Sequence, residues 1–163
     1  MRANLYRLLL LLSACLGTTS AGAAVTVSFT NPASYTDMGS YRDEPSTEMK
    51  EIETHLKQLG ERYLSPHQLL KIEVLDVDLA GSVSYSNHLR RDVRILRGKA
   101  DWPSIKLHYV LESDGRVLLD QQENVADMGY LEHPNKHYSG QFLQYEKQML
   151  DDWFRQRFAT HQR

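Results

Sequence analysis

Apolar and polar residues alternate along several short stretches of the chain, which is the pattern of a β-strand with one buried face. The clearest stretch is 25–30, where valine and phenylalanine alternate with threonine and serine. The same period recurs in 104–112, and Asp114-Gly115 then predicts a tight hairpin turn that returns the chain as 116–125. These three stretches are predicted strands of a sheet with one solvated face.

Two other stretches follow the period of an amphipathic helix. The first begins at Ser46 and ends near Tyr63, with Asp43 or Ser46 as its N-terminal cap. The second runs from about 141 to 159 and is the most aromatic part of the chain. Its apolar positions are Phe142, Tyr145, Met149, Leu150, Trp153, Phe154 and Phe158.

The longest strand candidate is 72–81, IEVLDVDLAG, and its apolar residues change side halfway. The apolar residues up to Val74 lie on one face of the strand, whereas those from Leu75 onward lie on the opposite face. In a regular strand Asp76 and Asp78 would then point into the core, where an unpaired polar group costs several kcal/mol. We predict a bulge or sharp twist at Val74 to Leu75 that turns both aspartates outward. The alternative is that both faces are covered in the first half of the strand.

The order of these elements predicts an α+β fold, β-α-β-β-β-β-α. A polar loop at 81–92 and a short strand at 93–97 complete the set. We expect residues 25–163 to form one domain, in which a single, largely antiparallel sheet of four to five strands carries both helices on one face.

Composition and charge say little about the fold, but they exclude some classes of function. Charged residues make up 25% of the 163 positions, and the net charge of −2 becomes −4 without the first 24 residues, which carry Arg2 and Arg7 and no acidic residue. A mildly acidic chain is not typical of a nucleic-acid-binding protein, so we expect no nucleic-acid partner. Cys15 is the single cysteine, which excludes an intrachain disulfide.

Residues 1–24 have the organisation of a signal peptide. Arg2 and Arg7 precede the short apolar run 8–16, and the small residues 21–24 fit a cleavage site. This predicts export to the periplasm. In the alternative reading, Leu-Ser-Ala-Cys ending at Cys15 is a lipobox, the cysteine is lipidated, and the protein is an outer-membrane-anchored lipoprotein. Membrane contact is expected only in that case.

Four blocks of sequence resemble a known bacterial family. They are VTVSFTNPASYTDMG (25–39), VLDVDLAG (74–81), ADWPSIKLHYVLE (100–112), and DMGYLE (127–132) followed by YEKQMLDDWFRQRF (145–158). They resemble the exported family known only as domain of unknown function 3016. The resemblance implies an envelope protein of Gram-negative bacteria. It brings no activity and no catalytic residues.

Clusters of chemically active residues are few. Asp76 and Asp78 on one strand face are within reach of a shared calcium or magnesium ion, yet two ligands are too few, and solvated charges are the favoured interpretation. His133 and His137 are interpreted as surface histidines, because a zinc site needs three or four ligands. We also expect Asp151 to pair with Arg155 on a solvated helix face, and Trp102 to close one end of the core. No catalytic residue, metal site or cofactor is predicted.

Because side chains alternate between the two faces of a strand, the sequence also predicts which residues occupy the open face of the sheet, away from the helices. They are Thr26, Ser28, Thr30, Arg94, Leu96, Lys106, His108, Val110, Leu118 and Asp120. Leu96, Val110 and Leu118 are candidates for an apolar patch, which would mark a partner surface. Scattered surface apolar residues, or simple dimerisation, explain them equally well.

Two functional hypotheses follow. The first is a non-enzymatic binding or adaptor module whose open sheet face, with Asp76, Asp78, Arg94, Lys106 and His108 as candidate binding residues, takes another envelope protein or an envelope component.

The second hypothesis is a metal-dependent or acid/base hydrolase centred on Asp76 and Asp78, with Asp101 or His108 as a further participant. A concave pocket that gathers these side chains would favour the hydrolase, whereas a flat sheet would favour binding.

Overall fold

A computed structural model describes residues 23–37 and 46–159 of the chain. The predicted signal peptide up to residue 22, its Cys15 and the candidate cap Asp43 lie outside these ranges. No helix in the described part of the chain is long and apolar enough to span a membrane.

Four strands form the main sheet, in the order β1-β2-β5-β6. Their bounds are β1 (Ala24–Phe29), β2 (Gln68–Asp78), β5 (Ser104–Ser113) and β6 (Arg116–Ala126). The pairs β2–β5 and β5–β6 are antiparallel, whereas β1 runs parallel to β2. The predicted α+β class is confirmed, but the single, largely antiparallel sheet is not: the parallel pair makes the main sheet mixed, and the described residues form a second, two-stranded sheet.

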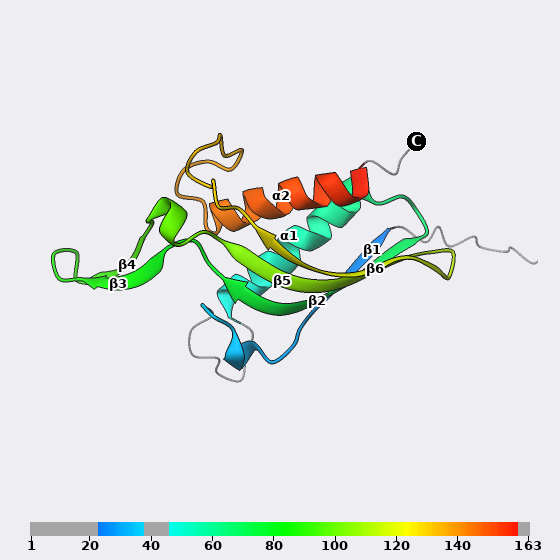
Figure 1. Ribbon diagram of the computed structural model, residues 1–163, viewed down its shortest axis with the longest axis horizontal. Coiled ribbons are helices and arrows are strands. Elements are labelled where there is room, and N and C mark those ends of the chain that lie inside the picture. Colours follow the sequence, from blue (N-terminus) through cyan, green and yellow to red (C-terminus); the bar gives the residue numbers. More distant parts are fainter. Residues whose placement is uncertain (1–22, 38–45, 160–163) are drawn as a thin grey trace, which may run out of the picture.

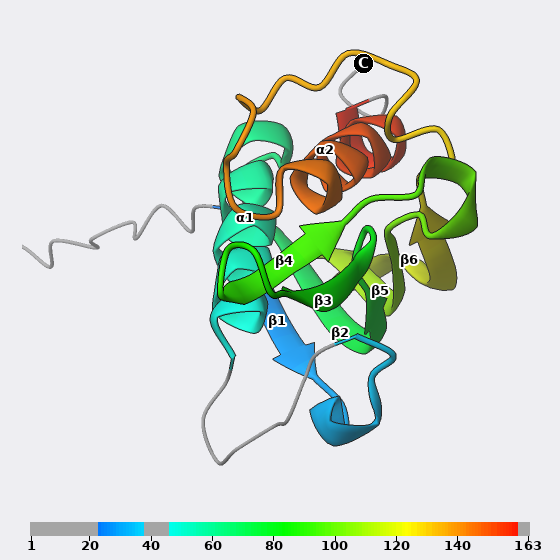
Figure 2. The same ribbon diagram turned by 90° about the vertical axis from the view of Figure 1, so that its left-hand side faces the viewer.

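Both helices, α1 (Thr47–Tyr63) and α2 (Gln144–Phe158), lie on one face of this sheet, as predicted (Figures 1 and 2). The Ser46 hydroxyl caps α1 by accepting a hydrogen bond from the Met49 N–H at 3.3 Å. Helix α1 connects β1 to β2, which is the crossover that a parallel strand pair requires.

A separate two-stranded ribbon projects from the body of the protein (Figure 1). It consists of β3 (Ser82–Ser86) and β4 (Arg91–Ile95), which pair antiparallel. Two expectations were therefore wrong: 81–92 is not a simple polar loop, and the strand predicted at 93–97 does not join the main sheet. Short 3-10 turns, η1 (Pro32–Ser34) and η2 (Gly98–Ala100), complete the described structure.

The predicted bulge in β2 is confirmed. Val74 pairs with Leu107 and Asp76 pairs with Lys106, so Leu75 is the extra residue. Val74 is fully buried before the bulge, whereas Asp76 is only half-buried after it. The register shift therefore changes which side of the strand faces the helices, and it removes both aspartates from the core.

The core lies between the sheet and the two helices. On the sheet side it contains the alternating residues of β5, including Tyr109, which is fully buried. On the helix side, Trp153 and Phe158 meet the Tyr109 ring edge to face at centroid distances of 5.5 and 5.8 Å. Trp102, expected to close the core, is half-buried and is not part of this cluster.

Candidate functional site

Asp76 has a structural role in the fold. Its Oδ1 accepts hydrogen bonds from the N–H groups of Thr36 and Val77, at 2.8 and 2.9 Å, and its Oδ2 accepts one from the Thr36 hydroxyl at 2.9 Å. Both carboxylate oxygens thus fasten the segment that follows η1 to the end of β2.

Asp78 lies beside other charged groups at the base of the ribbon. Burial raises its pKa above the ordinary range, and the negative charges of Asp37, Asp76 and Asp101 raise it further, against the effect of Arg94. Asp101 accepts hydrogen bonds from the Arg97 N–H and the Tyr130 hydroxyl through Oδ1, at 2.8 and 3.3 Å.

Arg94 does not lie on the open sheet face, where it was expected. One guanidinium nitrogen, Nη1, lies 3.0 Å from Asp37 and 3.0 Å from each of the carbonyl oxygens of Ala80 and Gly81. Because β4 belongs to the ribbon, Arg94 joins the ribbon to the end of β2. Leu96, which follows β4, is likewise absent from the sheet.

The open face of the sheet is polar, and its charges are paired. His108 Nε2 lies 2.7 Å from Asp120, and the Lys71 ammonium lies 2.6 Å from Glu112. The hydrogen bond to Asp120 is the main cause of a raised His108 pKa. Lys106 is exposed and lies opposite Asp76 across the strand pair. A shallow hollow of about 360 Å³ crosses this face.

The predicted apolar patch on this face does not form. Leu96 is outside the sheet, Val110 is half-buried between its strand partners Lys71 and Asp120, and Leu118 is exposed near the start of β6. The remaining side chains are mainly hydrophilic, so the open face resembles an ordinary solvated surface more than a docking surface.

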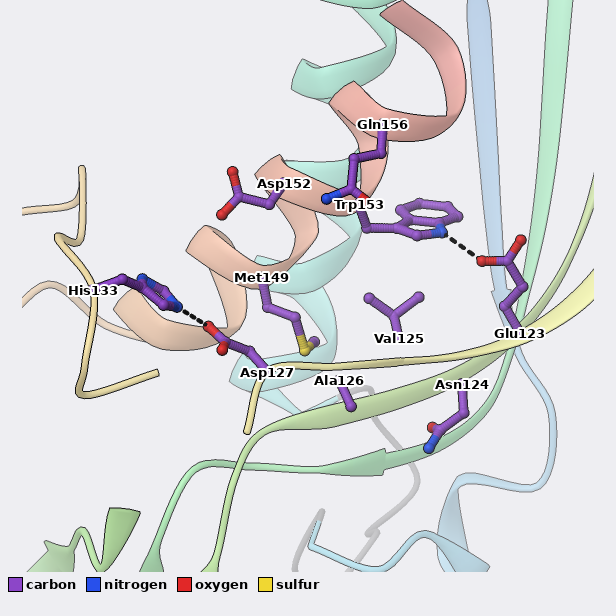
Figure 3. Close-up of a pocket in the computed structure, with 10 residues that line it drawn as sticks. All are labelled: Glu123, Asn124, Val125, Ala126, Asp127, His133, Met149, Asp152, Trp153 and Gln156. Atoms are coloured by element: carbon purple, nitrogen blue, oxygen red, sulfur yellow. Dashed lines mark hydrogen bonds and ion pairs between the residues drawn. The ribbon is translucent and has the colours of Figure 1, made fainter. Parts of the chain in front are cut away.

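Another hollow lies at the edge of the sheet, between β6 and α2 (Figure 3). It has a volume of about 340 Å³. We call it the β6–α2 groove. Its lining residues are Glu123, Asn124, Val125, Ala126, Asp127, His133, Met149, Asp152, Trp153 and Gln156.

The acidic residues of the β6–α2 groove are held in place by hydrogen bonds. Glu123 accepts from the Trp153 indole N–H at 3.1 Å, from the Tyr109 hydroxyl at 2.7 Å and from Arg157 at 3.1 Å. Burial, together with the hydrogen bond to Glu123, raises the Tyr109 pKa far above its ordinary value. Asp127 lies 2.8 Å from His133, as Figure 3 shows. The lining contains three acidic residues and no lysine or arginine.

A second polar cluster lies at the other side of α2 and was missed in the sequence. His55 Nε2 is 2.9 Å from Asp151 Oδ1, and His137 Nε2 is 3.1 Å from Asp151 Oδ2. Burial alone would raise the Asp151 pKa, but the hydrogen bonds and charges of the two histidines outweigh it and hold the pKa below its usual value.

This cluster corrects two interpretations. Asp151 is buried and does not pair with Arg155, whose partner is Asp152 at 2.5 Å. His133 is exposed, as predicted for a surface histidine, whereas His137 is half-buried and fixed by Asp151. One signal was available: His55 occupies a position on the apolar stripe of α1, three residues after Ile52.

Fold and site together define a small α+β domain with a polar groove at one sheet edge and a buried histidine–aspartate cluster. The family described as "Protein of unknown function (DUF3016)" matches residues 23–156, and the chain belongs to this family. No curated protein and no solved structure matches the chain.

Proposed function

We propose that the protein is a non-enzymatic binding module of the cell envelope that takes an extended peptide segment into the β6–α2 groove. The observation that carries this proposal is that five consecutive residues, 123–127, line one hollow. Successive side chains of a strand point to opposite faces, so consecutive residues share a hollow only along the strand edge, where the backbone is presented.

That edge has free capacity for hydrogen bonding. Among the residues that the structure describes, strand β6 is the last strand of the sheet and pairs only with β5. The outer backbone groups of an edge strand are a template for a further strand, and an added peptide strand satisfies them. The five residues of the groove span about 17 Å, which fits a peptide of about five residues.

Helix α2 supplies the opposite wall. Its contribution is Met149, Asp152, Trp153 and Gln156, which follow one another at helical spacing and form one stripe. Met149 and Trp153 give an apolar floor with Val125, and methionine adapts to differently shaped ligands. An exposed edge strand facing a helix stripe is the arrangement that strand addition uses, in which alternate side chains of the peptide reach the wall.

The charge of the groove favours a cationic ligand. Three acidic residues line it, Glu123, Asp127 and Asp152, and no lysine or arginine in the described part of the chain does. Their present partners are Arg157, His133 and Arg155, with which a cationic ligand would compete. Complementary charge mainly increases the rate of association and excludes wrong partners. We therefore propose a segment of another envelope protein that carries lysine or arginine at alternate positions.

The proposed binding surface is the β6–α2 groove and not the open sheet face, which was predicted from the sequence. Both surfaces carry paired charges, such as His108 with Asp120 on the open face and Arg157 with Glu123 in the groove, which a partner would have to desolvate. The groove differs because it also presents the backbone groups of an edge strand. The basic, apolar and small-residue regions of residues 1–24 support export, so we propose the periplasm as the location.

The test uses the acetylated pentapeptide Lys-Val-Lys-Val-Lys amide as a probe. About four added backbone hydrogen bonds at ~1 kcal/mol each predict a dissociation constant on the order of 1 mM, lowered further by charge. We expect amide shifts in nuclear magnetic resonance spectra at residues 123–127 and a shift of the Trp153 indole N–H. N-methylation of the alternate peptide amides that face β6 should abolish binding, and methylation of the other set should not.

Two matched substitutions locate the site. Asp152→Asn should weaken binding of the cationic peptide, whereas Asp120→Asn, which removes the same charge from the open face of β6, should not. Equal binding of both N-methylated peptides would exclude strand addition. Peptide-induced shifts confined to Lys71, Glu73 and His108 would show that the peptide binds the open sheet face and not the groove.

A further inference from the structure

We infer that His55, His137 and Asp151 form a binding site for a divalent transition-metal ion, with zinc as the best-fitting candidate. The three residues come from separate parts of the chain: α1, the segment between β6 and α2, and α2 itself. None of them lines the β6–α2 groove. The site therefore goes beyond the proposed peptide-binding function and is independent of it.

The ligand atoms have the separations that a small ion requires. One imidazole nitrogen from each histidine and one carboxylate oxygen of Asp151 all lie within 4.8 Å of one another. The two direct nitrogen–oxygen distances are 2.9 and 3.1 Å. In a tetrahedral site with metal–ligand bonds of about 2.0–2.1 Å, ligand atoms lie about 3.3 Å apart. The two measured distances run to different carboxylate oxygens of Asp151, so binding through one oxygen requires the side chains to adjust, with the widest separation of 4.8 Å closing by up to about 1.5 Å.

The surroundings hold the ligands in place before any ion binds. Asn135 donates a hydrogen bond to the Gln144 carbonyl oxygen at 3.0 Å and accepts one from the His137 N–H at 2.8 Å. The Lys136 N–H donates to the Gln148 side chain at 2.9 Å. These bonds fix the segment that carries His137 to α2. Outer contacts of this kind orient metal ligands.

The neighbouring charges permit a cation. Lys147 lies one helical turn before Asp151, but its ammonium group is 2.5 Å from Glu51, which compensates its charge. His55 Nε2 also lies 3.3 Å from the Lys147 carbonyl oxygen. A hollow of about 280 Å³ reaches His137 and is lined by polar groups that include His133 and Asn135. It offers a path for the ion and room for water as a fourth ligand.

The ligand types select the metal. Calcium and magnesium prefer sites made only of oxygen atoms, whereas imidazole nitrogen suits zinc, copper and nickel. Two imidazoles with one carboxylate and an open position is a ligand set that zinc adopts in proteins.

The test measures zinc binding to the full chain, expressed with its own leader and stripped with chelator before titration. We expect one zinc ion per chain and a melting temperature that rises with zinc. Cobalt(II) in place of zinc should give the visible absorption of a tetrahedral site. His137→Ala is the main variant, because His137 is half-buried on a connecting segment and its loss leaves the core intact.

The matched control is His88→Ala, which removes an exposed histidine between β3 and β4, away from both hollows. His137→Ala should weaken zinc binding at least roughly hundredfold and remove the zinc-dependent rise in melting temperature. His88→Ala should change neither. Absence of stoichiometric zinc on the folded wild-type chain, or equal loss in both variants, would overturn the site. Circular dichroism verifies that each variant is folded.

Discussion

Glu146 is a buried carboxylate at the start of α2. It is 3% exposed, and its Oε1 accepts a hydrogen bond from the Ala80 N–H at 2.8 Å. Burial is the main cause of its raised pKa, and the hydrogen bond from Ala80 and the charge of Arg94 oppose that effect without cancelling it. This residue therefore joins the end of β2 to α2, at an electrostatic cost when it is ionised.

The raised Glu146 pKa predicts a pH-dependent stability. The folded state binds the proton more tightly than the unfolded state, so the free energy of unfolding falls as the pH rises from the ordinary pKa through the raised one. Glu146→Gln keeps an oxygen acceptor for Ala80 and cannot ionise. We expect this variant to melt at a higher temperature than the wild type near pH 7, with a difference that shrinks toward about pH 4.

Glu132→Gln serves as the control for that measurement, because Glu132 is exposed and its charge costs little. Its melting temperature should follow the wild type at both pH values. The opposite result is a Glu146→Gln variant that melts below the wild type, with the largest difference near pH 7. That result would show that the ionised carboxylate stabilises the fold.

Tyr35 makes a second buried contact whose loss can be measured. Its hydroxyl donates to the Val74 carbonyl oxygen at 2.6 Å, at the bulge of β2, and burial raises its pKa to about 12. The Thr30 N–H donates to the same oxygen at 3.0 Å. Tyr35→Phe should therefore cost only ~1 kcal/mol in urea unfolding. A loss several times larger would mean that the bulge depends on this hydroxyl.

Individual residues differ in how well the sequence predicts their surroundings. The outward orientation of Asp76 and Asp78 follows from strand parity and the cost of burying a charge, and both arguments are local. The environment of Asp151 depends on histidines 96 and 14 positions away. No local pattern indicates that pairing, so the solvated helix face was the wrong interpretation.

At the scale of elements, the segments that form strands and helices could be predicted from local patterns, whereas the pairing of the strands depends on distant parts of the chain. β1, β5, β6 and both helices were predicted close to their observed bounds, and so was the Asp114-Gly115 turn, whose residues have φ values of 49 and 75°. β2 begins four residues before the predicted 72–81 stretch, and β3 was not predicted. The partner of each strand was harder to predict. β4 pairs with β3 and not with the main sheet, because the polar stretch before it is itself a strand. That error placed Arg94 and Leu96 on the wrong surface.

Helix α1 approaches β1 very closely at Gly60. A Cβ atom at this position would lie 2.0 Å from the Val25 side chain. Gly60→Ala would gain up to ~1 kcal/mol in helix propensity, but the clash in a packed interface costs ~1–3 kcal/mol. We expect a net fall in the melting temperature.

A double-mutant cycle tests the cause of that fall. Val25→Ala removes the methyl group that the new Cβ would meet, so Gly60→Ala should cost less in the Val25→Ala background than in the wild type. Equal costs in the two backgrounds would show that the strain lies elsewhere, for example in the backbone of α1.

At the scale of the whole molecule, the protein divides into a packed body and a projecting ribbon (Figure 1). None of the core residues belongs to β3 or β4. Arg94 links the two parts through Asp37 and the end of β2. The ribbon is therefore an addition to a sheet that is complete without it.

Replacement of residues 83–94 by Asn-Gly should leave the body folded. The loss of the Arg94 hydrogen bonds predicts a destabilisation of roughly 1–3 kcal/mol. Retained near-ultraviolet circular dichroism from Trp153 and Tyr109, together with a cooperative thermal transition, would verify the prediction. Arg94→Ala in the intact chain isolates the part due to those hydrogen bonds. Unfolding of the shortened chain, but not of Arg94→Ala, would show that the ribbon is part of the folding unit.

Under the proposed export, the parallel pairing of β1 with β2 determines the order of events during translocation. Ala24 is in register with Leu69, with all of α1 between them. A chain that crosses a membrane with its N-terminal end first exposes β1 long before its partner strand arrives. Until then the stretch beside the predicted cleavage site has no strand partner, and exposed chain of this kind is open to proteolysis. If the predicted leader is cleaved, as the proposed export requires, this topology leaves time for its removal before the sheet closes.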